Sequence, residues 1–262
     1  MSQFIKKLKQ VSQITPQPMG FRAIQPGSDR QKFMLIASLV QPDIDGLTDQ
    51  VAGADAGLLR ISKLSSGAKA LGKISRAAPD IPWGVWLEGI AREEVGQMAK
   101  AGFDCVVFPP ASTSLATLKD NKAGKILEME VSTGEDLLPA VNELPVDAVL
   151  IASKQEKDSL LTWQRLIFFQ GWANLLTKPL LACISSNVSN EELLALWKAG
   201  IRGIVIRIGK DQPAGRLKEL RQMIDKIAFP TLRKSKRLTP LLPYLSQEEH
   251  TTTDTDDEED IE

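Results

Sequence analysis

Short apolar runs rich in β-branched residues alternate with stretches of helical periodicity along most of the chain. The runs that read as strands lie at 33–40, 57–61, 83–88, 105–108, 125–131, 148–153, 179–185 and 203–208. Their first residues are 20 to 31 positions apart, which is the length of one strand and one helix. The pattern therefore predicts eight strand-helix units and a parallel sheet.

The junctions between helices and strands repeat a small motif. The segments AGADAGLL (52–59), AGFDCVVF (101–108) and AGIRGIVI (199–206) each end a helix and enter a strand, with a glycine suited to a left-handed helix cap. Ser189 and Glu192 form a predicted capping box. Eight parallel strands favour closure into a single (β/α)8 TIM barrel, because a closed sheet has no edges to protect. An open doubly wound sheet is the alternative, but QPDIDG (41–46) is not its glycine fingerprint.

The chain divides into three predicted regions. Residues 1–31 hold a short basic N-terminal helix and a lead-in, residues 32–230 form the barrel, and residues 231–262 hold a basic segment and an acidic tail. The tail from 247 onward carries nine acidic residues and no Lys or Arg, which is typical of a disordered, solvating segment. The rest of the chain has 24 acidic and 32 basic residues, so its net charge is about +8.

Composition narrows the chemistry and the compartment. The two cysteines, Cys105 and Cys183, lie in apolar runs, which indicates a reducing environment. The one histidine, His250, lies in the tail, so histidine acid–base chemistry and histidine-rich metal sites are excluded. We expect a cytoplasmic protein, because residues 1–13 lack the apolar core of a secretory signal and the apolar stretch 160–181 is interrupted by polar residues.

Charged residues inside the strands predict a polar pocket. Strands of a barrel point alternate residues toward the helices and toward the axis, and helix-facing positions should be apolar. The side chains expected to point inward are Ser38, Arg60, Glu88, Glu128, Glu130, Ser153, Ser185 and Arg207. Glu88, Glu130 and Arg207 fall near the C-terminal ends of their strands, where barrel enzymes carry out their chemistry.

Two interpretations of this pocket stay open. An anionic group can sit against the two arginines while a carboxylate across the mouth transfers a proton. Alternatively the arginines and glutamates pair with one another and hold no ligand. Lysines follow three of the strands, at Lys63, Lys154 and Lys210. Lys154 stands at the end of the sixth strand, where class I aldolase barrels carry a Schiff-base lysine, but its neighbours are those of an exposed loop.

One segment resembles a known group of barrels. Residues 178–209 (KPLLACISSNVSNEELLALWKAGIRGIVIRIG) resemble the last quarter of phosphate-binding (β/α)8 barrels of the nitronate monooxygenase and phosphoribosylanthranilate isomerase types. The resemblance implies a phosphate held by backbone N–H groups after the seventh and eighth strands. Here Ser185 and Ser186 replace the glycine pair, and Arg207 with Lys210 replaces the small-residue loop, which speaks against bound FMN.

The sequence thus predicts a barrel that binds a small anionic metabolite, phosphorylated or carboxylated, and leaves open whether it is an enzyme. Lyase or isomerase chemistry would need neither metal nor histidine, and no particular cofactor is indicated. The residues assigned to the anion are Arg60, Ser185, Ser186, Arg207 and Lys210, and those assigned to catalysis are Glu88 and Glu130.

The alternative is a non-catalytic barrel that acts in assembly. The predicted helix 160–176 is apolar on nearly every side, so we expect it to mediate homo-oligomer formation, with Phe168 or Trp172 on its outer face. The basic run RKSKR (233–237) is a weaker sign of nucleic-acid binding, because no aromatic residues are interleaved with it.

Overall fold

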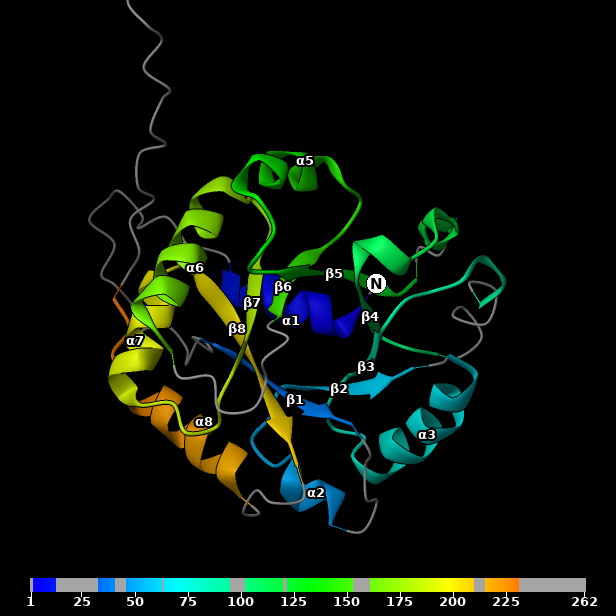
Figure 1. Cartoon of the computed structure of the whole chain (residues 1–262). Helices are drawn as coiled ribbons and strands as arrows, with labels where there is room; N and C mark the ends of the chain where they lie inside the picture. Colours follow the sequence, from blue (N-terminus) through cyan, green and yellow to red (C-terminus); the bar gives the residue numbers. More distant parts are fainter. Residues whose placement is uncertain are drawn as a thin grey trace, which may run out of the picture. The chain divides into compact units, whose positions relative to one another are not determined.

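The computed structural model shows a closed barrel of eight parallel strands in sequential order, β1 to β8 (Figure 1). It describes residues 2–12, 33–40, 46–62, 64–94, 102–119, 122–152, 161–209 and 215–230. The strands are β1 Met34–Leu39, β2 Ala56–Ile61, β3 Trp83–Leu87, β4 Cys105–Phe108, β5 Gly124–Glu130, β6 Ala148–Ala152, β7 Leu180–Ile184 and β8 Ile201–Ile208. β1 pairs with both β2 and β8, which closes the sheet.

Helices surround the barrel on its outer side (Figure 1). The outer helices are α2 Leu47–Gln50, α3 Leu64–Ala77, α5 Leu138–Glu143, α6 Trp163–Leu175, α7 Asn190–Lys198 and α8 Arg216–Lys226. The N-terminal helix α1 Gln3–Ser12 lies apart from them, and short 3-10 helices are present at η1 Arg92–Glu94, η2 Pro110–Ser112, η3 Leu115–Lys119 and η4 Glu135–Leu137. Within the described residues, no helix has the length and apolar character needed to cross a membrane.

The predicted architecture is confirmed. All eight strands lie where the apolar runs predicted them, and the closed sheet shows that the open doubly wound alternative is wrong. The glycines of the repeated junction, Gly53, Gly102 and Gly200, have φ of 91°, 72° and 95°, as a left-handed cap requires. The capping box of Ser189 and Glu192 is also present. The predicted acidic tail, together with Lys63, Ser153, Lys154 and Lys210, lies outside the described residues.

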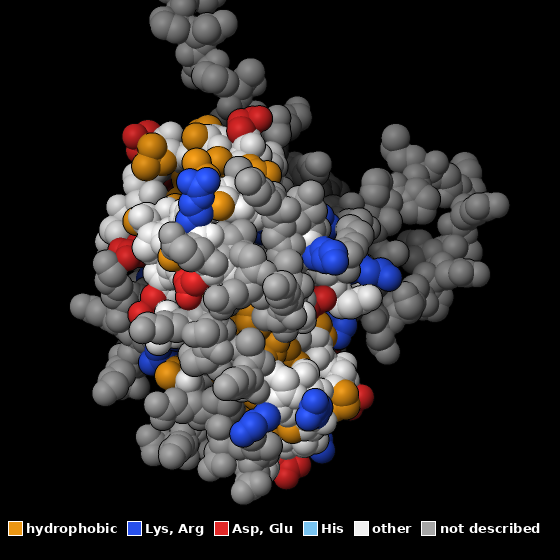
Figure 2. Space-filling view, turned by 90° about the vertical axis from the view of Figure 1, so that its right-hand side faces the viewer, with side chains coloured by type: hydrophobic (Ala, Val, Ile, Leu, Met, Phe, Trp, Pro, Cys, Tyr) orange, Lys and Arg blue, Asp and Glu red, His pale blue; other side chains and the backbone are white. Residues whose placement is uncertain are grey.

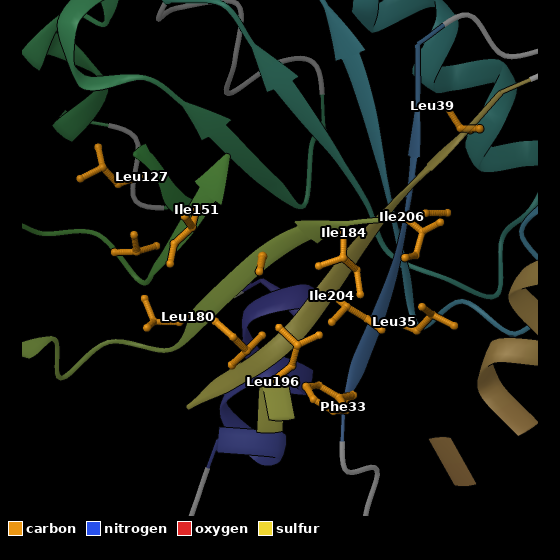
Figure 3. Close-up of a cluster of buried hydrophobic side chains, with 14 of the residues drawn as sticks. Phe33, Leu35, Leu39, Leu127, Ile151, Leu180, Ile184, Leu196, Ile204 and Ile206 are labelled. Atoms are coloured by element: carbon orange, nitrogen blue, oxygen red, sulfur yellow. The ribbon is translucent and has the colours of Figure 1, made fainter. Parts of the chain in front are cut away.

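Two hydrophobic layers lie on the two sides of the sheet. The outer layer joins the strands to the helices, and Figure 3 shows Leu35, Ile204 and Ile206 among its side chains. The inner layer fills the barrel with the alternate residues of the strands, such as Ile36, Leu58 and Val205. This separation is the alternation of strand side chains that the sequence pattern predicts.

The N-terminal helix belongs to the inner layer. Phe4, Ile5 and Leu8 of α1 are at most 2 % exposed and pack against the inward-facing side chains of the strands. Figure 1 shows α1 within the ring of strands. A Cβ added to Gly124, the first residue of β5, would lie 2.4 Å from Cγ1 of Ile5. The close approach of helix and strand therefore requires glycine at this position.

Hydrogen bonds and charges fix α1 at the N-terminal ends of the strands. Asp104, just before β4, accepts hydrogen bonds from the Ser2 hydroxyl at 2.8 Å and from the backbone N–H of Phe4 at 2.7 Å. The carboxylate thus caps a helix from a distant part of the chain, where it also meets the positive end of the helix dipole. Lys7 donates to the carbonyl of Asp55 at 2.9 Å, and Lys9 is 3.5 Å from the carboxylate of Asp147.

The three aspartates that contact α1 occupy equivalent places. Asp55, Asp104 and Asp147 directly precede β2, β4 and β6. Asp55 accepts the backbone N–H of Leu35 at 2.7 Å, and Asp147 accepts that of Lys125 at 3.0 Å. Asp55 also forms a buried ion pair with Arg221 of α8. This end of the barrel is therefore a structural end, closed by a helix and a ring of carboxylates.

We predict that Phe4→Ala lowers the free energy of unfolding by about 3–5 kcal/mol, because it removes a fully buried ring and leaves a cavity in the barrel. Urea denaturation followed by circular dichroism measures this. Lys6→Ala, at an exposed position of the same helix, is the matched control and should change stability by less than about 0.5 kcal/mol. Equal effects of the two substitutions would show that α1 does not contribute to the core.

Candidate functional site

The inward-facing side chains become polar toward the C-terminal ends of the strands. Arg60 is level with Trp86 in the register of β2 and β3, and Arg207 is level with Ser38 in that of β8 and β1. Glu130 is level with Ala152 of β6, which belongs to the inner layer. The predicted inward direction of Ser38, Arg60, Glu128, Glu130 and Arg207 therefore agrees with the register.

Trp86 forms the floor beneath these polar groups. Its side chain is 3 % exposed and belongs to the inner layer. Its indole N–H donates a hydrogen bond to Oε2 of Glu128 at 2.7 Å, and the guanidinium of Arg60 lies 4.8 Å from the ring centroid. One ring thus holds a carboxylate through its edge and a cation against its face, the two polar interactions that an indole offers.

The carboxylates of the site act on one another. Burial raises the pKa of Glu128 above its usual value, and the negative charges of Glu130 and Glu88 raise it further. The Trp86 hydrogen bond and the charge of Arg60 act in the opposite direction, but burial is the larger effect. Glu88 and Glu130, the two predicted catalytic residues, therefore lie within electrostatic reach of a third carboxyl, Glu128, which the sequence had only placed inward.

The arginines also influence each other. Burial lowers the pKa of Arg207, and the nearby charge of Arg60 lowers it further. Arg207 nevertheless keeps an exposed side chain, and Arg60 is half-buried. Two guanidinium groups from strands on either side of β1 thus lie within electrostatic reach of each other, an arrangement that favours an anion between or beside them.

The backbone around Glu88, directly after β3, is held by contacts with the loop after β4. The Ser112 hydroxyl donates to the carbonyl of Glu88 at 2.6 Å, and Ile90 forms a β-bridge with Thr113. A Cβ on Gly89 would lie 2.6 Å from the carbonyl oxygen of Ser112, so this approach depends on glycine. The Glu88 side chain itself is exposed, whereas Glu130 is half-buried and accepts a hydrogen bond from Ser132 at 3.2 Å.

The two serines after β7 are engaged in local structure. The Ser185 hydroxyl accepts the backbone N–H of Asn187 at 3.2 Å. The carbonyl of Ser186 accepts Nε and Nη2 of Arg216 at 3.0 and 2.8 Å. Arg216, at the start of α8, therefore fixes the β7–α7 connection, a role that no strand pattern reveals because the residue lies in a helix. Lys210 lies outside the described residues.

A further arginine lies at the end of β7. Arg165, in the first turn of α6, donates through Nη2 to the carbonyl of Cys183 at 2.9 Å, and its guanidinium lies 5.6 Å from the ring centroid of Phe169. Burial lowers the pKa of this arginine. Burial and the charge of Glu128 raise the pKa of Cys183 to about 12, so its thiol stays protonated and is a poor nucleophile at neutral pH.

The site combines positive groups with a protonatable carboxyl. Its arrangement suits binding of an anion and proton transfer to or from a neighbouring atom. Among the residues that the structure describes, no group of three or more His, Cys, Asp or Glu side chains is placed to hold a metal ion. Sequence reasoning missed Trp86, Arg165 and Arg216. Only Trp86 carried a signal, since it shares the inward direction of Glu88 two residues later.

Comparison with known proteins establishes the fold alone. Tryptophan synthase from M. tuberculosis superposes with a TM-score of 0.54 at 14 % identity, over 74 % of this chain and 92 % of that one. The YdjI aldolase from Escherichia coli K12 gives 0.52 at 12 % identity, over 74 % and 88 %. A mutant tryptophan synthase alpha-subunit from Pyrococcus furiosus gives 0.52 at 12 % identity, over 73 % and 96 %. No family model and no curated protein sequence matches the chain.

We predict that Glu128→Gln becomes more stable relative to the parent protein as the pH rises. A raised pKa means that the folded state prefers the protonated carboxyl, so the stability contributed by Glu128 is present at low pH and is lost as the pH rises through that pKa. Glutamine keeps the neutral form, and the difference should grow from about pH 4 upward. Urea denaturation across this range measures it.

Glu143→Gln, at the exposed end of α5, is the control for removing a carboxylate far from the site. A stability difference between Glu128→Gln and the parent protein that stays constant with pH would contradict the raised pKa.

Proposed function

We propose that the barrel binds a small anionic metabolite, phosphorylated or carboxylated, at the C-terminal ends of its strands. The observation that carries the proposal is the pair Arg60 and Arg207, which come from strands on both sides of β1 and lie close enough for Arg60 to lower the pKa of Arg207. Guanidinium groups bind phosphate and carboxylate in bidentate geometry and keep their charge at neutral pH.

The segment after β7 supports the same assignment. Ser185 and Ser186 complete the proposed anion site, together with Lys210 after β8, in line with the resemblance of residues 178–209 to phosphate-binding barrels. Arg216 holds the backbone of Ser186 and thereby fixes the loop in which both hydroxyls lie. We assign Arg216 a positioning role, because its Nη1 is also engaged by Glu219 at 2.8 Å.

Proton transfer is assigned to the carboxyl groups. We propose Glu88 and Glu130 as catalytic residues together with Glu128, whose raised pKa favours the protonated carboxyl that a proton donor needs. The fold is shared with a tryptophan synthase alpha-subunit and an aldolase. Lyase or isomerase chemistry is the reaction class that this combination of residues supports best.

We predict that Arg207→Gln weakens binding of glycerol 3-phosphate and inorganic phosphate at least about tenfold, a loss of about 1.4 kcal/mol. Its melting temperature should change little, because the side chain is exposed. Isothermal titration calorimetry and thermal melts measure the two effects. Arg76→Gln, an exposed arginine in the last turn of α3, is the matched control. A parent protein that binds neither of these phosphates nor a carboxylate such as butyrate would overturn the proposal.

A second candidate function is assembly through α6. Trp163 and Ile167, one helical turn apart, are 83 % and 68 % exposed. Of the two residues expected on the outer face, Phe168 is half-buried and Trp172 is fully buried. The expectation is wrong for Trp172, because this side chain packs in the hydrophobic layer between the helices and the strands. Figure 2 shows the side of the molecule turned away from α6, and the hydrophobic side chains at the top of that view lie at the end where Figure 1 draws α5.

We predict that the protein self-associates and that the double variant Trp163→Asp, Ile167→Asp abolishes this. Apolar area buried between two copies stabilises a dimer by about 25 cal/mol per Å², and a carboxylate at each position would be desolvated there. Sedimentation velocity measures the change. Leu115→Asp, an equally exposed apolar position in η3, is the control and should leave the association intact. A parent protein that is monomeric at high concentration rules out this function.

A further inference from the structure

Four charged residues of strands β2, β5 and β8 are arranged by sign at the C-terminal end of the barrel. Arg60 and Arg207 come from β2 and β8, the two neighbours of β1. Glu128 and Glu130 come from β5, and Glu88 directly follows β3. In the closed order β1 to β8, β5 stands opposite β1. The two arginines therefore flank β1 and the two glutamates of β5 lie across the mouth from them, whereas Glu88 follows the strand next to β2.

The two sides lie close to each other across the Trp86 ring. Arg60 lies against the face of this ring, and Glu128 accepts a hydrogen bond from its edge at 2.7 Å. Arg60 is also near enough to lower the pKa of Glu128. The positive and the negative groups of the mouth therefore come together at this ring, through Arg60 and Glu128.

Groups of like sign repel each other within each side. Glu130 and Glu88 both raise the pKa of Glu128, and Arg60 lowers that of Arg207. A ligand that is only an anion gains from the arginines but is repelled by the carboxylates opposite, and a ligand that is only a cation meets the reverse situation. A molecule that carries both charges, oriented along the line from β1 to β5, is attracted at both ends.

We propose that the ligand of this site is a small zwitterion, whose phosphate or carboxylate binds Arg60 and Arg207 and whose ammonium group binds Glu130 and Glu88. This inference rests on the proposed anion site and adds the second half of the ligand. An organic ammonium is assigned rather than a metal ion because the described carboxylates are not grouped as metal ligands.

Matched ligands that differ only by an amino group provide the test. Ethyl phosphate is compared with 2-aminoethyl phosphate, butyl phosphate with 4-aminobutyl phosphate, and butyrate with 4-aminobutyrate, by calorimetry at neutral pH. The best amino ligand should bind about tenfold more tightly than its partner without the amine. The phosphate and carboxylate pairs decide which anion the arginines receive.

Variants on each side locate the two charges. Glu130→Gln and Glu88→Gln should remove most of the gain from the amine and leave binding of the alkyl phosphate equal or stronger. Arg207→Gln should weaken both members of each pair. Glu143→Gln, whose carboxylate is exposed at the end of α5, should leave both affinities unchanged.

The outcomes separate this inference from the proposed function. If alkyl phosphates or butyrate bind in an Arg207-dependent way and no amino ligand binds more tightly, the zwitterion is wrong and the anion site stands. A gain from the amine that persists in both Glu→Gln variants also overturns it. If no ligand of the panel binds the parent protein, both proposals fall.

Discussion

The interior of a closed eight-stranded barrel has to be filled, and in this protein one end is filled by the chain's own N-terminal helix. Phe4, Ile5 and Leu8 complete the inner layer, and Gly124 leaves the space into which Ile5 fits. Gly84 and Gly203 likewise make room for the inward side chains Cys105 and Leu181. Apolar side chains thus occupy the N-terminal end of the interior, and the inward-facing polar groups of the described strands lie at the other end.

The aspartates at the N-terminal end of the barrel and the charged residues at the C-terminal end have different kinds of partners. Asp55, Asp104 and Asp147 stand at strand entrances, where backbone N–H groups and basic side chains satisfy them. At the C-terminal end one aromatic side chain contacts both charges: the Trp86 ring lies against the Arg60 guanidinium, and its N–H donates a hydrogen bond to Glu128. Burial of a carboxyl on an aromatic floor raises its pKa, which is a cost to stability that proteins accept mainly at functional sites.

Sequence periodicity predicted the barrel because the fold depends on local signals that repeat. The junction glycines Gly53, Gly102 and Gly200 and the inward direction of Arg60 and Arg207 follow from strand alternation and cap geometry. The periodicity of the sequence could not predict contacts between residues that are far apart along the chain. The insertion of α1 into the barrel depends on a hydrogen bond between residues about a hundred positions apart, Phe4 and Asp104.

The same limit explains the candidate site. Nothing in the sequence around Arg165 or Arg216 indicates that their guanidinium groups reach the carbonyls of Cys183 and Ser186. A long side chain in the first turn of a helix can reach either solvent or a strand end, and only the packing of helix against barrel decides which. The alternation of strand residues predicts which side chains face the barrel axis. It does not predict which long side chains of the surrounding helices reach the C-terminal ends of the strands.

The proton on Glu128 links the two sides of the mouth. Its pKa is raised by burial and by Glu130 and Glu88, and lowered by Trp86 and Arg60. An anion bound at Arg60 screens the charge that lowers this pKa and so favours the protonated carboxyl, whereas a cation near Glu130 favours the carboxylate. In the proposed site, occupancy of either side would therefore change the protonation of Glu128, and linkage would require that the pH change the affinity of each side in return. The carboxyl that shares the Trp86 ring with Arg60 would thus be coupled to a ligand through electrostatics.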